Sequence, residues 1–239
     1  MSLIRFAALA TVVAFCGLPT PSLAGGSPAT GPNLTGQVSA LDPDLLYQGW
    51  RARPLLGQMA RAKGDSQTIG TVRDLVVDKD GRAAALVIEG GGPADMLDAL
   101  YRVPWANVDL TPGQDGVRID LASGSEKPQY GLFPGSEGVA TLPREFRLNE
   151  ILGDYARLQS GYGYGVVTDA VFTRDGRMSA VLVTRDVSAG GGTTAFAFRG
   201  VSGPWDPGMS YYGLPFVTEG QAREAGLRID PKRFSNAAF

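Results

Sequence analysis

Residues 69–88 read IGTVRDLVVDKDGRAAALVI, and this stretch decides the fold because the chain contains it twice. It recurs as YGVVTDAVFTRDGRMSAVLV at residues 164–183, at a constant offset of 95, with 8 of 20 positions identical. A fixed period longer than any solenoid repeat indicates a duplicated small domain. The identical pairs are Gly70/Gly165, Val72/Val167, Asp74/Asp169, Val76/Val171, Asp80/Asp175, Gly81/Gly176, Arg82/Arg177 and Ala85/Ala180.

Each copy has the pattern of a β-hairpin. In the first copy, β-branched and aliphatic residues fill Gly70 to Val77 and Ala83 to Glu89, as expected for strands. The sequence DKDGR between them supplies the Asp and Gly of a tight turn, and the second copy keeps this turn as TRDGR. A further strand is predicted at Ala99 to Val103, and a last hairpin from residues 107–110 to residues 117–121. Five or six short strands of this kind usually close into a small barrel, which removes exposed edges.

The second copy differs from the first in length and in its ending. Triple glycines recur at residues 90–92 and 190–192, and a Pro-Trp pair recurs at Trp105 and Trp205, now at an offset of 100. The step from 95 to 100 places five extra residues near Thr184 to Ser188. After Trp205 the last hairpin has no evident counterpart. Short helical segments are predicted after Asp42, as an N-cap, and from Thr218 to Ala225 before Gly226.

The first 24 residues have the pattern of a cleaved export signal. Arg5 precedes an apolar run from Phe6 to Leu18, and small residues place the cleavage site after Ala24. This run has 13 residues, whereas a membrane-spanning helix needs roughly 20, so a retained anchor is the less favoured alternative. Lipidation of Cys16 is less favoured still, because bulky Phe15 precedes it.

The address predicted for the mature chain is a bacterial periplasm, which makes it a secreted protein. Processing removes the only cysteine and leaves 21 basic and 24 acidic residues, a net charge of −3. Export without disulfides is compatible with a chain of this size. Arginine outnumbers lysine 18 to 4, a bias typical of GC-rich bacterial genes. The mild acidity and even spread of basic residues provide no footprint for nucleic acid.

The motifs together resemble the PRC-barrel family. The resemblance rests on LLGQMARAKGDSQTIGTVRDLVVDKDGRAAALVIEGGG with YRVPW in the first copy, and on ILGDYARLQSGYGYGVVTDAVFTRDGR with AGGG and GPW in the second. The second copy is degenerate, since Thr173 replaces the counterpart of Asp78. Barrels of this family occur in the H subunit of photosynthetic reaction centres and in a ribosome-maturation factor. The resemblance implies a docking platform rather than a catalyst, and it implies no specific ligand site.

The fold expected from these patterns is all-β, with two small PRC-barrel-like β-barrels in tandem after the signal peptide and a flexible leader. The predicted segments are a signal peptide at 1–24, a leader at 25–49, a first barrel at 50–122, a linker at 123–143, a second barrel at 144–217 and a C-terminal tail at 218–239.

Few chemistries remain open to this chain. It has no histidine, which excludes imidazole acid–base catalysis and the nucleophile and zinc sites that depend on it. We therefore predict no enzymatic activity, no cofactor and no metal. A calcium loop at Asp78 to Gly81 is disfavoured, because the third acidic position and the distal Glu are missing. The glycine-rich segments at 161–165 and 190–192 lack the context of a nucleotide-binding loop.

The duplicated acids Asp74 and Asp169 sit on the same strand face as valines, so they are expected to be partly buried. A buried carboxylate is a candidate acid or base. The favoured interpretation is structural, with each acid paired to Arg82 or Arg177 or bonded to turn amides, so that Asp74→Asn lowers stability. The remaining structural repeat positions are Gly70, Asp80, Gly81, Trp105, Gly165, Asp175 and Gly176.

Aromatic residues provide the candidate surface for a partner or ligand. They are concentrated in the loops of the second copy: Tyr162, Tyr164, Trp205, Tyr211, Tyr212 and Phe216. Tyr and Trp often anchor interfaces. An equally weighted alternative is that the segment after Trp205 folds back and fills its own barrel. The leading hypothesis is docking of a protein partner or envelope component. The alternatives are small-molecule or glycan binding through these rings, and hydrolysis by carboxylates alone.

Overall fold

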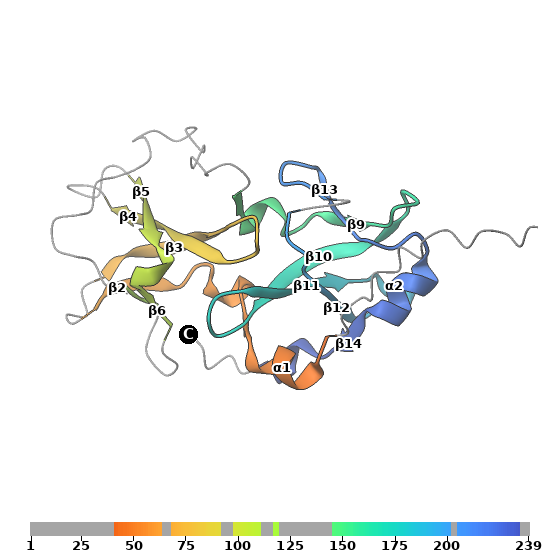
Figure 1. The fold of residues 1–239 in the computed structure, drawn as a ribbon. Helices are drawn as coiled ribbons and strands as arrows, with labels where there is room; N and C mark the ends of the chain where they lie inside the picture. The colour runs from red at the N-terminus through yellow and green to blue at the C-terminus, as the bar shows by residue number, and fades with distance from the viewer. Residues whose placement is uncertain are drawn as a thin grey trace, which may run out of the picture. The chain divides into compact units, whose positions relative to one another are not determined.

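The computed structural model describes residues 41–63, 68–91, 98–110, 117–119, 145–201 and 205–234. Within these ranges the chain is mostly β-strand, arranged in two sheets of seven strands each with two short α-helices (Figure 1). The all-β class predicted from the sequence is therefore confirmed at this level. No helix of the described part is long and apolar enough to cross a membrane. The predicted signal peptide, residues 25–40 of the leader and the whole linker at 123–143 lie outside the described residues.

The first sheet is formed mainly by the first copy, in the order β5-β4-β3-β2-β7-β6. The predicted hairpins β3–β4 and β6–β7 are both antiparallel, as expected. The sequence did not show that β2 and β7 pair in parallel. The strands are β2 (Met59–Ala62), β3 (Thr68–Val77), β4 (Ala83–Gly91), β5 (Asp98–Pro104), β6 (Val108–Asp109) and β7 (Val117–Ile119).

The second sheet repeats this plan, in the order β13-β9-β10-β11-β12-β14. Here β13 pairs in parallel with β9, as β7 does with β2. Among the described strands none lies outside β13 in the position that β6 holds in the first sheet, and β14 instead extends the opposite edge. The described pairings do not close either sheet into a barrel. The strands are β9 (Tyr155–Arg157), β10 (Gly163–Phe172), β11 (Met178–Thr184), β12 (Thr193–Ala197), β13 (Tyr211–Gly213) and β14 (Leu227–Ile229).

A reciprocal strand exchange links the two copies. No pattern in the sequence predicts this exchange. Strand β1 (Trp50–Arg51) precedes the first sheet in the chain but pairs with β10 of the second. Strand β8 (Phe146–Arg147) precedes the second sheet but pairs with β3 of the first. Each copy therefore contributes its leading strand to the sheet of the other, and the two copies share a common fold unit.

The duplicated turns also meet each other. Arg82 and Arg177 form an antiparallel bridge, with Ala83 N–H donating to the Gly176 carbonyl at 2.8 Å and Met178 N–H to the Gly81 carbonyl at 2.7 Å. Gly81 and Gly176 have φ angles of +82° and +81°, the left-handed region that favours glycine. A Cβ at Gly176 would also lie 2.6 Å from Trp105 Nε1, so two independent constraints select glycine at this turn.

One hydrophobic cluster spans both sheets. Trp50 stacks on Phe172 of the second sheet with 4.7 Å between ring centroids, and on Trp105 of the first with 5.6 Å. In the other copy, Phe146 meets Trp205 edge-on at 5.2 Å. The exchanged strands thus carry aromatic anchors into a shared core, and burial of such large rings is the main source of stability here.

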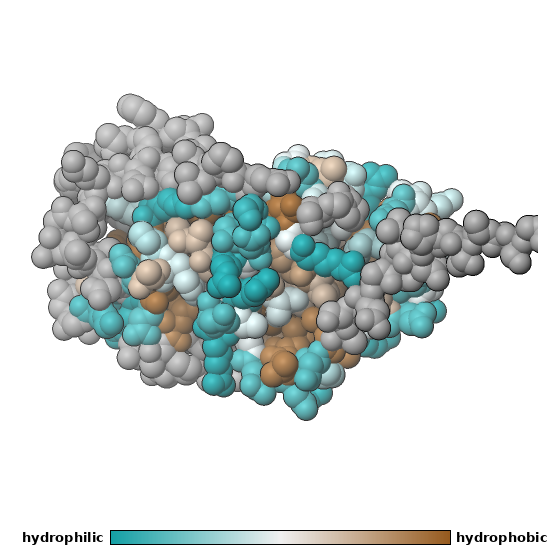
Figure 2. Space-filling model, in the orientation of Figure 1, coloured by the Kyte–Doolittle hydropathy of each residue, from teal (hydrophilic) through white to brown (hydrophobic). Residues whose placement is uncertain are grey.

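The helices and short 3-10 segments close the ends of the sheets. Helix α1 (Pro43–Gln48) begins after the N-cap Asp42, and α2 (Glu219–Ala225) has a Thr218–Gln221 capping box and ends before Gly226, as the sequence predicts. The end of the expected leader is thus helical, and Leu46 of α1 is buried. Hydrophobic residues reach the surface over α1 (Figure 2), where Leu45 is exposed. The 3-10 segments are η1 (Arg53–Leu55), η3 (Trp105–Asn107), η4 (Leu148–Glu150), η5 (Val187–Ala189) and η6 (Pro231–Arg233).

Candidate functional site

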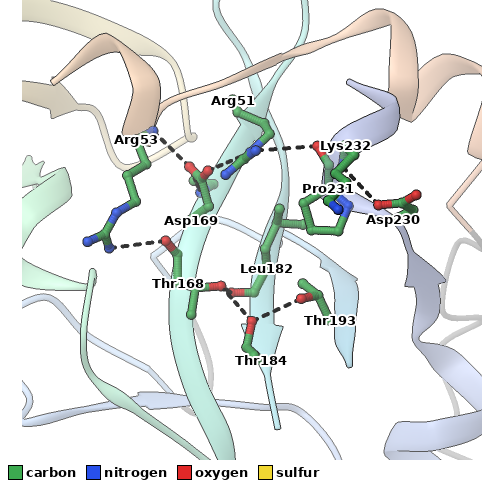
Figure 3. A network of polar contacts seen from close by, with 11 residues as sticks. Arg51, Arg53, Thr168, Asp169, Leu182, Thr184, Thr193, Asp230, Pro231 and Lys232 are labelled. Atoms are coloured by element: carbon green, nitrogen blue, oxygen red, sulfur yellow. Dashed lines mark hydrogen bonds and ion pairs between the residues drawn. The ribbon is translucent and has the colours of Figure 1, made fainter. Parts of the chain in front are cut away.

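Asp169 is a buried carboxylate that binds the segment from Arg51 to Arg53, which belongs to the first copy and contains part of the exchanged strand β1. Its Oδ2 accepts a hydrogen bond from Arg51 Nε at 2.8 Å, and its Oδ1 accepts from the backbone amides of Arg53 and Ala170, each at 2.8 Å. Figure 3 shows Arg51 reaching from Asp169 toward the carbonyl of Pro231. Burial raises the pKa of Asp169, and the Arg53 amide and the Arg51 charge oppose this shift.

Asp74, the duplicate of Asp169, holds the reciprocal segment with fewer partners. Its Oδ1 accepts from the amides of Leu75 at 2.8 Å and Asn149 at 3.2 Å. The counterpart of Arg51 is Arg147, whose Nε instead donates to Glu150 at 3.0 Å. Burial, only partly offset by these amides, raises the pKa of Asp74 to about 6.

These contacts favour a structural role for both acids over an acid–base role. In each copy one carboxylate oxygen accepts a hydrogen bond from an amide of the 3-10 segment that follows the exchanged strand. Asp169 accepts from Arg53 of η1, and Asp74 accepts from Asn149 of η4. The expected pairing with Arg82 or Arg177 is wrong, because those arginines lie at the turns. Each acid instead accepts from one backbone amide of its own strand, Leu75 or Ala170, and from one amide of the other copy, Asn149 or Arg53. The donors are therefore backbone amides, as the alternative expected, but they do not belong to the DGR turns. Asp74 also lines a polar cavity of about 510 Å³.

The other repeat positions have local roles. A Cβ on Gly70 would lie 2.1 Å from the Glu89 carbonyl oxygen, and one on Gly165 would lie 2.6 Å from that of Thr184. Both glycines are therefore required by the close approach of the paired strand. The turn acids Asp80 and Asp175 are exposed, and they bond to Lys79 and Thr173 respectively. Within the described residues no three His, Cys, Asp or Glu side chains cluster as metal ligands would.

Four of the six aromatic residues proposed as a surface are buried. Tyr164, Trp205, Tyr212 and Phe216 are between 4% and 7% exposed. Trp205 lies 5.2 Å from Tyr212, and Phe196 lies 5.4 Å from Tyr164 and 5.7 Å from Phe216, centroid to centroid. Burial also raises the pKa of Tyr212. The segment after Trp205 thus folds back on its own sheet, and these rings are corrected from surface to core residues.

The remaining two aromatic residues lie at an exposed edge with two residues that the sequence analysis missed. Tyr211 on β13 is in register with Tyr155 on β9, and the Arg157 guanidinium lies 4.7 Å from the Tyr211 ring centroid. Tyr155 is 67% exposed and Tyr162, in the adjacent turn, is 76% exposed. We call Tyr155, Arg157, Tyr162 and Tyr211 the tyrosine edge. The alternation Tyr-Ala-Arg at 155–157, with buried Ala156 between two exposed residues, was the signal available for it.

Comparison with known proteins supports the resemblance for the first copy. Residues 51–124 match the PRC-barrel domain. The match begins within β1, includes every strand of the first sheet except β8, and does not extend to the second copy. No curated protein matches the chain. The relation of the second copy to the PRC-barrel domain therefore rests on its repeated sequence and on the repeated strand order described above.

Proposed function

We propose that the chain is an exported, non-enzymatic interaction protein in which two PRC-barrel-like β-barrels in tandem, the second degenerate, dock a protein partner. The PRC-barrel match of residues 51–124 supports the docking role. The lack of any histidine supports a role without catalysis. The signal-like first 24 residues support the periplasmic address.

The tyrosine edge is the observation that carries the docking proposal. Tyr and Arg side chains are enriched at protein interfaces, and Tyr provides a large contact area with few rotatable bonds. Here Tyr155 is exposed on β9 and Tyr211 is partly exposed on the adjacent β13. Arg157 lies beside Tyr211 and is held by hydrogen bonds to the Gly161 carbonyl at 3.1 and 3.2 Å. A surface that is already ordered loses little conformational entropy on binding. The edge lies on the second copy, so the first copy serves mainly as scaffold.

The glycan alternative is less well supported. Stacking on a sugar needs an open aromatic face, and Tyr164 and Trp205 are 5% and 4% exposed. Tyr162 and Tyr155 are open, but they lie on a projecting edge and line none of the cavities described here. An exposed aromatic edge outside these cavities is better suited to a protein partner.

Site-specific crosslinking tests the docking proposal. A photoreactive residue replacing Tyr155 in the exported chain should crosslink to a discrete partner in the envelope, and the same residue replacing Leu45 should not. The crosslink should disappear when Tyr211→Ser is added. Leu45 is a matched control because it is 64% exposed on α1, away from the edge. Equal products from both positions, or a crosslink unaffected by Tyr211→Ser, would contradict the proposal.

Two further experiments test export and the structural role of Asp74. Cell fractionation should recover the chain in the periplasm with its N-terminus at Gly25, and recovery of the unprocessed chain in the cytoplasm would contradict export. The variant Asp74→Asn should retain crosslinking through position 155. Loss of the crosslink in a folded Asp74→Asn protein would reassign that carboxylate to the functional surface.

A further inference from the structure

A second, separate feature of the second copy is a cavity of about 370 Å³ between the β11–β12 connection and the C-terminal segment. Strand β14 pairs with β12, and α2 precedes β14, so these segments lie together at one end of the sheet (Figure 1). We call this cavity the arginine pocket. Its lining includes Tyr164, Arg185, Gly190, Gly191, Arg223 and Arg228.

Arg185 forms the inner wall of the pocket. Its guanidinium lies 4.6 Å from the Tyr164 ring centroid, and its Nη1 donates to Glu219 at 2.8 Å. The side chain is only 12% exposed, yet its Nε is buried and has no hydrogen-bond partner. A buried guanidinium donor without an acceptor is costly, and an acceptor supplied by a ligand would remove that cost.

Arg228 and Arg223 bring two more guanidinium groups to the pocket. Arg228 lies against the backbone of Gly192, where a Cβ would be 2.7 Å from its Nη2. Its guanidinium forms no hydrogen bond or ion pair with the described residues. Arg223 donates to Glu219 at 2.6 Å. Glu219 is therefore shared by two arginines, and both hydrogen bonds lower its pKa. Three cations facing one carboxylate leave an excess of two positive charges.

None of these arginines has a counterpart among the described residues of the first copy. Arg185 belongs to the five residues by which the second copy is longer, and Arg223 and Arg228 belong to α2 and β14, which have no equivalent among the described elements of the first sheet. The triple glycine at residues 190–192, which has φ angles of +98°, +59° and +84°, brings the backbone close to Arg228. Within the part of the chain that the structure describes, the pocket is therefore specific to the second copy.

We propose that the arginine pocket binds the phosphoryl group of a phosphomonoester. Guanidinium groups match phosphate oxygens in geometry and bind them through charge-assisted hydrogen bonds. An excess of two positive charges is balanced by a phosphoryl dianion, whereas a single carboxylate leaves one uncompensated. The volume accommodates the phosphoryl group with a small substituent. This site is independent of the tyrosine edge, and either can fail without the other.

Calorimetric titration of the full mature chain with glycerol 3-phosphate and with inorganic phosphate, at low salt and pH 8, tests the proposal. Arg228→Ala should weaken binding about tenfold, because a charge-assisted contact is lost, and Glu219→Gln should strengthen it severalfold by removing the competing carboxylate. Arg174→Ala is the matched control, because this exposed arginine lies at the β10–β11 turn. All three positions are exposed, so thermal stability should change little.

The charge state of the ligand provides a second readout. The ionisable groups that line the pocket are the three arginines and Tyr164, and Glu219 is bonded to two of those arginines. The lowered pKa of Glu219 keeps it ionised at pH 5.5. The second ionisation of a phosphomonoester lies near pH 6. Affinity should therefore fall severalfold from pH 8 to pH 5.5, and the ¹⁵N-edited Nε–H signal of Arg185 should shift on binding at pH 8.

Vesicles containing phosphatidic acid distinguish a lipid headgroup from a soluble phosphate ester. Binding of the soluble esters that depends on Arg228 supports a small soluble ligand. Vesicle binding that depends on Arg228, without binding of the soluble esters, supports the headgroup source of the same chemistry. No binding of either probe, or equal losses in Arg228→Ala and Arg174→Ala, would overturn the proposal.

Discussion

Arg51 and Asp169, 118 residues apart in the chain, form a 2.8 Å ion pair in which the carboxylate is almost completely buried. The pair joins the exchanged strand β1 to β10, so it connects the start of one copy to the centre of the other. No such ion pair forms at Asp74 among the described residues: Arg147 Nε donates to Glu150, and the hydrogen-bond donors to Asp74 are the backbone amides of Leu75 and Asn149. The duplicated acid therefore has an arginine partner in the second copy, and its hydrogen-bond donors in the first copy are backbone amides.

Replacing Arg51 should destabilise the fold. In Arg51→Met the Asp169 carboxylate keeps its amide donors but loses its cation, and an unpaired buried charge is costly. We expect a loss of about 2 kcal/mol in the free energy of unfolding at pH 8, below the usual figure for fully buried pairs because Arg51 is partly exposed. Urea denaturation measures it. Arg147→Met is the matched control and should lose less than about 1 kcal/mol; equal losses would show that the ion pair contributes nothing specific.

Asp74 should make stability depend on pH. Its folded-state pKa of about 6 lies above the ordinary value of 3.8, so the native state binds the proton more tightly and stability falls as pH rises through this interval. Two pKa units correspond to about 3 kcal/mol as an upper estimate. Asp74→Asn removes this term while its side-chain oxygen still accepts the amides. The variant should therefore be more stable than the wild type at pH 8 and lose this advantage near pH 4.

The comparison should be made as a difference between two curves. Asp169 and Asp154 also have raised pKa values and give both proteins a slope of the same sign, which cancels in the difference. Lower stability of Asp74→Asn at pH 8 would instead agree with the expectation from sequence alone, in which the charged form of Asp74 stabilises the fold.

The sequence predicted the local structure well because its signals are local. Runs of β-branched and aliphatic residues and the DGR turns located β3, β4, β10 and β11, and the caps at Asp42 and Thr218 located both helices. The exchange of β1 and β8 was not predictable, because strands of two residues carry no periodicity. The hydrogen bond between Asp74 and the amide of Asn149 was also missed, because the two residues lie 75 positions apart and no local pattern connects them.

At the candidate site, too, local features could be predicted from the sequence, whereas contacts between distant segments could not. The sequence showed that tyrosines concentrate in the second copy, but whether a ring faces solvent depends on the path of the chain after Trp205. That path places Tyr212 in the core and Tyr211 at the edge, although the two are adjacent in sequence. The arginine pocket was also missed, because its three arginines come from separate segments with no common spacing.

Gly176 should be more sensitive to substitution than Gly153, which has a positive φ but open space around it. Gly176→Ala adds a Cβ that would lie 2.6 Å from Trp105 Nε1 and also forces φ of +81° on alanine. We expect a loss of about 3 kcal/mol, combining backbone strain and overpacking. Gly153→Ala is the control, because its φ is +95° and no atom lies within 4 Å of the added Cβ; it should lose about 1 kcal/mol. Similar losses in both variants would show that the Trp105 contact relaxes without cost.

The reciprocal exchange should make the two copies unfold together. Removing β8 from the first sheet exposes Val76 and Val77 of β3, and removing β1 exposes Val171 and Phe172 of β10, so neither sheet keeps its core when the other unfolds. Differential scanning calorimetry of the mature chain should show one transition whose calorimetric and van't Hoff enthalpies agree. A chain ending at residue 143 lacks β8 and Phe146 and should unfold without a cooperative transition. Two resolved transitions in the full chain, or a cooperatively folded fragment, would show that each copy is stable without the strand it receives from the other.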